Sequence, residues 1–326
     1  MKRFLAIAVI ACTSLVAGPV PADVNFTTSG PAPGNMRFAW IHGSISAKHN
    51  QDVRIQVHQY NAHTFILRQN PAIHWEAPFM YLLFGNDGAV LLDTGATANP
   101  GYFPIRAQID ALVERWQAEH GVSKVPLTVV PLGSEASQVT GLEQFADRRN
   151  TNILAPGSRA RSRWLIDQDA VLDLGGRVLK VIPAPGLDAD AIALYDPYTQ
   201  FLLTGNAFYP GRLVIRDFEA YKATLERLAA FTRDYPVKWL MGGRIEMSDS
   251  PGIDYRLRSN YRPREHVLQM SPALLVDGYQ IVHLINGRED IRIHDDFIVM
   301  NGVGRGARDY GWPSYTPPQY QRRFLR

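Results

Sequence analysis

The sequence predicts an α/β sandwich, and three observations lead to this fold class. Its 326 residues are 46% apolar and 20% charged, a composition that supports a sizeable hydrophobic core. Short apolar segments bounded by Gly, Pro or Asp recur along the chain and are typical of strands. Longer segments between them carry apolar residues at helical spacing. Strands in groups with helices interspersed favour an α/β sandwich over an all-β barrel.

The composition excludes several classes of protein. The chain contains one cysteine, which excludes a disulfide framework, a cysteine-based zinc site and a thioredoxin-type redox pair. Lysine and arginine number 34 against 31 aspartates and glutamates, so the net charge is +3. Basic and acidic residues nearly balance, so the net charge is too small to attract nucleic acid, and the chain has no stripe of basic residues. We therefore expect no nucleic-acid partner.

Residues 1–22 have the pattern of a signal peptide. Two basic residues precede an apolar run at 4–18, and prolines and Ala22 follow it. A membrane anchor is one alternative, but the run is shorter than the roughly 18–20 apolar residues that span a bilayer. Lipidation at Cys12 is a second alternative to cleavage after Ala22. We expect a secreted or periplasmic protein without stable membrane insertion.

The first half of the remaining chain is predicted to be rich in strands. Residues 23–50, with many Gly, Pro, Ser and Asn, form an extended lead-in. The pattern then predicts strands at 53–57, 81–84 and 89–92, with a turn between the last two. Apolar side chains at helical spacing predict a helix over 105–120, and Gly121 is placed to end it. A buried strand follows at 127–130 and runs into a loop at 131–138.

The second half repeats this alternation. Short apolar segments predict four strands, at 152–154, 177–182, 191–195 and 201–204. A helix with apolar positions between 218 and 229 ends before Pro236, a strand follows at 238–241, and residues 264–275 are predicted to be helical. These elements form one domain over residues 51–300, including a C-terminal helix and strand. Residues 301–326, rich in Gly, Arg, Tyr and Pro, are predicted to be a poorly packed tail.

Five segments carry recognisable motifs. They are Val90-Leu-Leu-Asp93-Thr-Gly95, residues 129–141, Pro185-Gly186-Leu187, Leu203-Thr-Gly205-Asn206 and Gly242-Gly243-Arg244-Ile-Glu-Met. In this order they resemble the Asp-Thr-Gly strand, the His-x-His-x-Asp-His-x-x-Gly loop, Pro-Gly-His, Leu-x-Gly-Asp and Gly-Gly-His-Ile-Glu-Met of the metallo-β-lactamase superfamily, in particular its exported bacterial members. The resemblance covers roughly residues 50–260 and implies an αββα four-layer sandwich.

The resemblance also implies a pocket that holds two zinc ions through imidazoles and carboxylates. At the seven ligand positions this chain has Gly133, Glu135, Ser137, Gln138, Leu187, Asn206 and Arg244. Glycine and leucine offer no lone pair, neutral amides are poor zinc donors, and arginine is a permanent cation. These seven residues, with the retained Asp93, are the candidate former metal-site pocket, and no catalytic residue can be assigned. We expect the di-zinc cofactor to be lost.

Three hypotheses for this pocket follow. Arg244 replaces the missing zinc charge and pairs with Glu135 or with Asp93. Alternatively, the oxygens of Glu135, Asp93, Asp188 and Asn206 hold Mg²⁺ or Ca²⁺, although the nearby arginine opposes a cation. In the third, Ser134 or Ser137 is a nucleophile, although no histidine lies in the matched segments to act as its base. The arginines at 159, 161 and 163 either edge the pocket mouth or form a solvated face.

The function predicted from these residues is that of an exported pseudoenzyme that has lost di-zinc hydrolysis and keeps the pocket for binding. The expected partner is an anionic small molecule attracted by Arg244, or another protein of the envelope. The alternative is a hydrolase of an ester, lactone, thioester or β-lactam that works without the usual zinc pair. A third possibility is an assembly role for the C-terminal segment.

Overall fold

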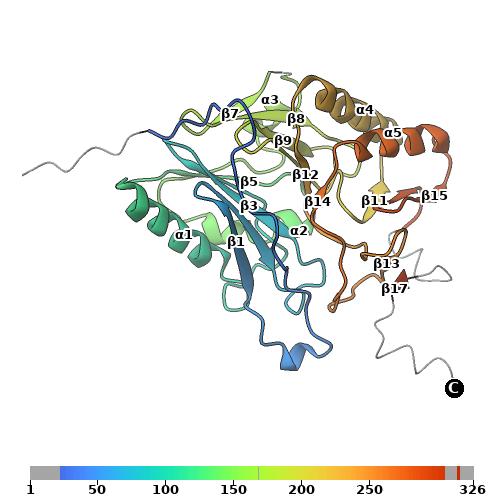
Figure 1. Ribbon diagram of the computed structural model, residues 1–326, viewed down its shortest axis with the longest axis horizontal. Helices are drawn as coiled ribbons and strands as arrows, with labels where there is room; N and C mark the ends of the chain where they lie inside the picture. The colour runs from blue at the N-terminus through green and yellow to red at the C-terminus, as the bar shows by residue number, and fades with distance from the viewer. Residues whose placement is uncertain (1–22, 168, 305–313, 316–326) are drawn as a thin grey trace, which may run out of the picture.

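The computed structural model describes residues 23–167, 169–304 and 314–315. Within these ranges the chain forms four layers, with a helix on the outer face of one six-stranded sheet and two helices on the outer face of another (Figure 1). The two sheets pack face to face. The αββα sandwich predicted from the sequence is therefore confirmed.

The first sheet has the order β1-β2-β3-β4-β5-β6 and is antiparallel up to β4 and parallel from there. Its strands are β1 (Ile55–Asn61), β2 (Thr64–Gln69), β3 (Phe79–Phe84), β4 (Ala89–Leu92), β5 (Leu127–Val130) and β6 (Thr151–Ile153). Helix α1 (Ile105–His120) covers the outer face and has the predicted bounds. Gly121 ends it with a φ of 64°, a left-handed conformation that glycine adopts without a steric cost.

The second sheet has the order β14-β12-β10-β9-β8-β7. Its strands are β7 (Val171–Asp173), β8 (Val178–Pro183), β9 (Ile192–Asp196), β10 (Phe201–Gly205), β12 (Trp239–Gly242) and β14 (Gln269–Met270). Helices α4 (Phe218–Asp234) and α5 (Leu274–Ile285) cover its outer face. Asp217 caps α4, because its carboxylate accepts a hydrogen bond from the Ala220 N–H at 3.0 Å.

Smaller elements complete the chain. A three-stranded sheet contains β11 (Arg212–Ile215), β15 (Asp290–Ile293) and β16 (Ile298–Asn301), and β13 (Asp254–Tyr255) pairs with β17 (Ser314–Tyr315). The short helices are η1 (Ala47–His49), α2 (Ala136–Val139), η2 (Leu142–Phe145) and α3 (Arg159–Trp164). Between the two large sheets lies one hydrophobic core, to which Tyr81 and Val90 contribute from the first sheet and Leu194 and Leu203 from the second. Alternate residues of the same strands face the helices.

Two sequence expectations need correction. The helix predicted over 264–275 is wrong, because this segment is irregular up to β14 and the helix begins at Leu274. Pro272 lacks an N–H and disfavours helical backbone at the residue before it, so it precedes the helix rather than lying inside it. Strand β2 was not predicted. All six of its residues are buried, so it lacks the polar alternation that marks a half-exposed strand.

The ends of the chain are described only in part. The predicted signal peptide, residues 1–22 with Cys12, lies outside the described residues, as does most of the predicted tail. The lead-in packs on the body, since Phe26 is buried and the Ala32 N–H donates to the Tyr198 carbonyl at 2.7 Å. Within the described ranges, no helix combines the length and the apolar character that crossing a bilayer requires.

One buried ion pair joins the two sheets. Arg177, at the start of β8, forms a bidentate pair with Asp196 of β9 at 3.1 and 2.5 Å. Its remaining N–H groups donate to the carbonyls of His63 and Phe84 and to the hydroxyl of Thr64, at 2.7 to 3.0 Å. All five donors of this fully buried guanidinium are therefore satisfied. The arginine ties β2 and β3 of the first sheet to the second sheet.

Arg177→Ala is expected to lower the free energy of unfolding by about 3–5 kcal/mol, because the Asp196 carboxylate loses its buried partner. Urea denaturation followed by circular dichroism measures this. The matched control is Arg292→Ala, which removes an exposed arginine paired with Asp290 and should cost less than about 1 kcal/mol. Equal losses for the two variants would contradict the role assigned to Arg177.

Candidate functional site

The candidate pocket lies at the ends of β4, β5 and β10, where their loops meet. Asp93 follows β4 with a φ of 60°, which an aspartate tolerates better than most residues. Its Oδ1 accepts a hydrogen bond from the Leu132 N–H at 2.7 Å. The Thr94 N–H and hydroxyl both donate to the Gln138 carbonyl at 2.8 Å. The retained Asp-Thr segment therefore fixes the loop at 131–138 against the end of β4.

The Asp93 carboxyl is fully buried, and this changes its acidity. Burial raises the pKa of Asp93 from 3.8 to about 7, because the charged form loses its hydration. Hydrogen bonds from Leu132 and Gln138 and the positive charges of Arg161 and Arg244 act in the opposite direction. Loss of hydration is the largest of these effects. The carboxyl therefore exchanges its proton near neutral pH.

Side chains and loops fill the interior of the pocket. A Cβ atom at Gly133 would lie 2.6 Å from the Gln138 Oε1 and 2.9 Å from a carboxylate oxygen of Asp188. The Gln138 Nε2 in turn lies 3.4 Å from the Asp93 Oδ2. A cavity lined by Gln138, Leu187, Asp188 and Asn206 has a volume of about 10 Å³. This is room for one water molecule at most, whereas a dinuclear centre needs two ions roughly 3.5–4 Å apart and a bridging water.

Ser137 and Asn206 also face each other inside the pocket. Both are buried, and the Asn206 Nδ2 donates to the Ser137 Oγ at 3.3 Å. Among the described residues, the Ser137 hydroxyl makes no other hydrogen bond. A nucleophilic serine needs a base within reach of its hydroxyl, and an amide cannot serve as one. Ser134 is exposed, and its N–H donates to Asp188. The geometry therefore gives no support to the serine hypothesis.

Glu135 lies outside the pocket interior. Its carboxylate pairs with Arg216 at 2.8 Å, and 63% of the Arg216 side chain is exposed. These two residues line a groove of about 310 Å³ together with Leu187, Val214 and Ile215. Glu135, Asp93, Asp188 and Asn206 thus do not converge on one point. In the described part of the chain, no three His, Cys, Asp or Glu side chains are placed to hold a metal ion.

Arg244 has a different partner from the one predicted. It is fully buried, follows β12, and pairs with Glu76 from the loop between β2 and β3 rather than with Glu135 or Asp93. Its guanidinium lies 5.0 Å from the centre of the Tyr209 ring. The expected pairing is wrong because Glu135 faces the exposed groove. Glu76 lies 168 positions before Arg244 in the sequence but next to it in space. The loop that carries Glu76 shows no motif that would have identified it.

Arg161 is a second buried cation near the pocket. Of the three arginines at 159, 161 and 163, the first and last are exposed, so the solvated-face interpretation holds for those two. Arg161 instead donates through Nε and Nη2 to the Asp190 carbonyl, at 3.3 and 2.9 Å. Burial lowers its pKa to about 10, although Asp93, Asp190 and Asp188 oppose this shift. Two arginines, rather than one, therefore supply positive charge near Asp93.

Comparison with known proteins places this geometry in context. No family model matches the chain. Acyl-coenzyme A thioesterase MBLAC2 of Gallus gallus is 30% identical over 130 residues, which cover 36% of this chain and 46% of the relative. The human MBLAC2 is 25% identical over 219 residues, 56% of this chain and 77% of that protein. The chain thus spans about half the length of the chicken relative.

Solved structures with a similar arrangement include two metallo-β-lactamases. The enzyme from Pontibacter korlensis has 16% identity and a TM-score of 0.47, and the match covers 70% of this chain and 99% of that one. The enzyme from Hirschia baltica has 12% identity and a TM-score of 0.44, with 59% and 91% covered. The layer order of this chain, with its two six-stranded sheets between helices, is the one that the sequence resemblance implied.

Asp93→Asn should change how stability depends on pH. Because the pKa of Asp93 is raised in the folded protein, its contribution to the free energy of unfolding is complete below about pH 4. This contribution is lost as the pH rises through about 7. The asparagine is neutral throughout and keeps an oxygen for the Leu132 N–H. The difference in unfolding free energy, variant minus wild type, should increase between pH 4 and 7 by up to about 1.4 kcal/mol per pH unit and then level off.

Urea denaturation of both proteins at several pH values between 4 and 8.5 tests this. Other titrating groups, such as His63, are common to both proteins and cancel in the difference. Parallel curves over the whole range would contradict the raised pKa.

Proposed function

The chain has the metallo-β-lactamase fold, and from this premise we propose that it is an exported binding protein that has lost di-zinc hydrolysis. The small cavity beside Gln138, Leu187 and Asn206, three of the former ligand positions, carries this proposal. Its volume is about 10 Å³, and the Gln138 side chain also lies within 2.6 Å of where a Cβ at Gly133 would be. A hydrolase of this fold needs room for metal, water and substrate in that place.

The chemistry of the donor set supports the same conclusion. The pocket presents the carboxyls of Asp93 and Asp188, two amides and a hydroxyl, and these groups hydrogen-bond to one another or to backbone. Amides and hydroxyls are weak zinc ligands compared with imidazole and thiolate. The residues present therefore do not fit a dinuclear zinc centre. Export rests on the N-terminal apolar run with its basic start and small-residue end.

The groove outside the pocket is the proposed binding surface. Its volume of about 310 Å³ lies at the lower end of the range for small-molecule sites. Leu187, Val214 and Ile215 supply apolar contact area, and Arg216, which is 63% exposed and paired with Glu135, supplies a cation beside them. A small amphiphile with a carboxylate or phosphate suits this combination. The cation that would attract it is Arg216 instead of the buried Arg244. A protein of the envelope is the other candidate partner.

A thioesterase is the second candidate function. Two curated relatives bear the name acyl-coenzyme A thioesterase, and a thioester is among the substrates that the fold's hydrolases would accept. The groove would place an apolar acyl chain near Arg216. This activity requires a water or side-chain nucleophile that is activated without the usual zinc pair. Glu135, which lines the groove beside Arg216, is the candidate general base.

Metal analysis and a substrate panel separate the two functions. After dialysis against micromolar zinc, the purified mature protein should retain less than about a tenth of an equivalent. Hydrolysis of palmitoyl-coenzyme A, nitrocefin, nitrophenyl esters and lactones should match the buffer blank for the wild type and for Glu135→Ala. Two bound equivalents of zinc, or turnover that Glu135→Ala abolishes, would overturn the proposed loss of hydrolysis.

A further inference from the structure

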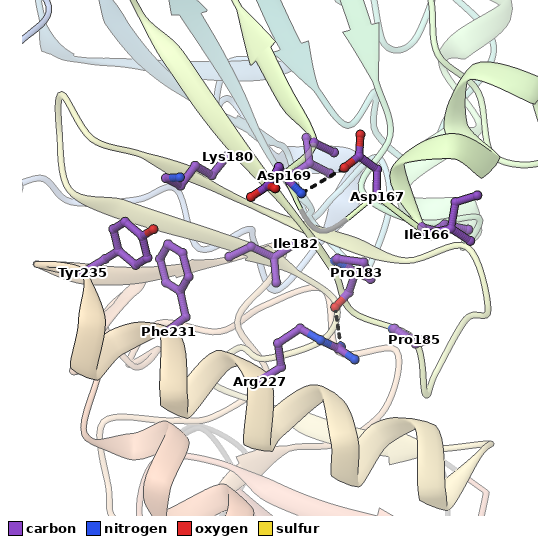
Figure 2. A pocket seen from close by; sticks show the side chains of 13 residues that line it. Ile166, Asp167, Asp169, Lys180, Ile182, Pro183, Pro185, Arg227, Phe231 and Tyr235 are labelled. Carbon is purple, nitrogen blue, oxygen red and sulfur yellow. Dashed lines mark hydrogen bonds between the residues drawn. The ribbon is translucent and has the colours of Figure 1, made fainter.

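A larger pocket lies on the outer face of the second sheet, away from the former metal site. It is bounded by β8, by α4 and by the segment that precedes β7 (Figure 2). Its volume is about 520 Å³, against about 10 Å³ in the former metal pocket. Sites for small organic ligands measure roughly 300–1,000 Å³. The size of this second pocket therefore suits a small molecule.

One wall of the pocket is aromatic and apolar. Phe231 and Tyr235 project from the C-terminal end of α4 and stack with ring centres 4.3 Å apart and an interplanar angle of 15°. Ile182 and Pro183 of β8 continue this surface. Phe231 is only half-buried, and Tyr235 has 37% of its surface exposed, so part of the aromatic surface remains available to a ligand. Such a surface binds apolar or aromatic side chains.

Four charged residues surround this wall. Lys180 from β8 and Arg227 from α4 are the cations, and Asp167 and Asp169, just before β7, are the acids (Figure 2). Within the described ranges, none of the four is part of an ion pair. The Lys180 ammonium lies 5.0 Å from the centre of the Tyr235 ring, and Arg227 donates to the Pro183 carbonyl at 2.8 Å. These contacts hold both cations at the pocket and leave their charges without an anionic partner.

The two signs of charge come from different walls. Both acids belong to one loop, where the Asp169 N–H donates to the Asp167 carboxylate at 3.0 Å, whereas both cations lie on β8 and α4. A ligand with only a negative charge would pair with the cations but also face two carboxylates. A purely cationic ligand would pair with the two carboxylates but would be repelled by the two cations. A ligand with both charges and an apolar body avoids both conflicts.

We propose that this pocket binds a short apolar peptide with free ends. The ammonium of its N-terminus pairs with Asp167 and Asp169, its carboxylate pairs with Lys180, and its side chains lie on the aromatic wall. A peptide about two residues long fits a site of this size. The proposal is independent of the fate of the former metal pocket.

Isothermal titration calorimetry with leucyl-phenylalanine tests the proposal on the full mature chain. The free dipeptide should bind saturably. Its N-acetylated form and its C-terminal amide, which each lose one charge, should bind about tenfold more weakly or worse, because a charge-assisted contact is removed. Equal affinities for the free and capped dipeptides would overturn the proposal, as would no saturable binding of the free dipeptide up to about ten millimolar.

Two variants assign each charge to its residue. Lys180→Gln should weaken the free dipeptide about tenfold but leave the C-terminal amide unchanged, and Asp169→Asn should weaken the free dipeptide but not the acetylated form. Both side chains lie at the protein surface, so thermal unfolding should match the wild type. Lys124→Gln, which removes an exposed lysine far along the chain from the pocket, is the matched control and should bind as the wild type does. If either variant weakened the free, acetylated and amidated dipeptides equally, the proposed orientation would be overturned.

Discussion

The central constraint on this molecule is that polar groups buried in the candidate pocket must find partners within the protein. A buried polar group without a hydrogen bond costs more than most single interactions contribute. Here the Asp93 carboxyl takes the Leu132 N–H, Gln138 approaches Asp93, and Asn206 donates to Ser137. Each of these contacts draws one loop toward another. A cavity of about 10 Å³ is found beside Gln138, Leu187 and Asn206.

Buried arginines organise the rest of the structure in two different ways. Arg177 uses all of its donors and links the two sheets, so it acts as a structural clamp. Arg244 pairs with Glu76, but its Nε and Nη2 find no hydrogen-bond partner among the described residues. An incompletely satisfied cation offsets less of its desolvation cost. We therefore attribute to Arg244 the specification of the pocket, through the position of the Glu76 loop, rather than a large share of the stability.

Local patterns explain what the sequence could predict. The bounds of α1 follow from its apolar spacing and from Gly121, and most strands follow from short apolar runs between turn residues. The replacement of the family's ligand residues at the seven matched positions was also visible, because ligand chemistry belongs to single residues. The partner of Arg244 was not, since Glu76 lies 168 positions away and carries no motif. The collapse of the pocket was equally hidden, because it depends on which volume the Gln138 side chain occupies.

The packing around Gly133 and Gly205 limits how this chain could change in evolution. A side chain at Gly133 would meet Gln138 and Asp188, and one at Gly205 would meet Leu132 and Gln138. A histidine in place of Gly133 would therefore meet Gln138 and Asp188 before it could act as a ligand. A larger side chain at either glycine would therefore lower stability unless its neighbours shifted. The two glycines thus let the loop at 131–138 and the end of β10 pack against each other, and they leave little freedom for substitution at this junction.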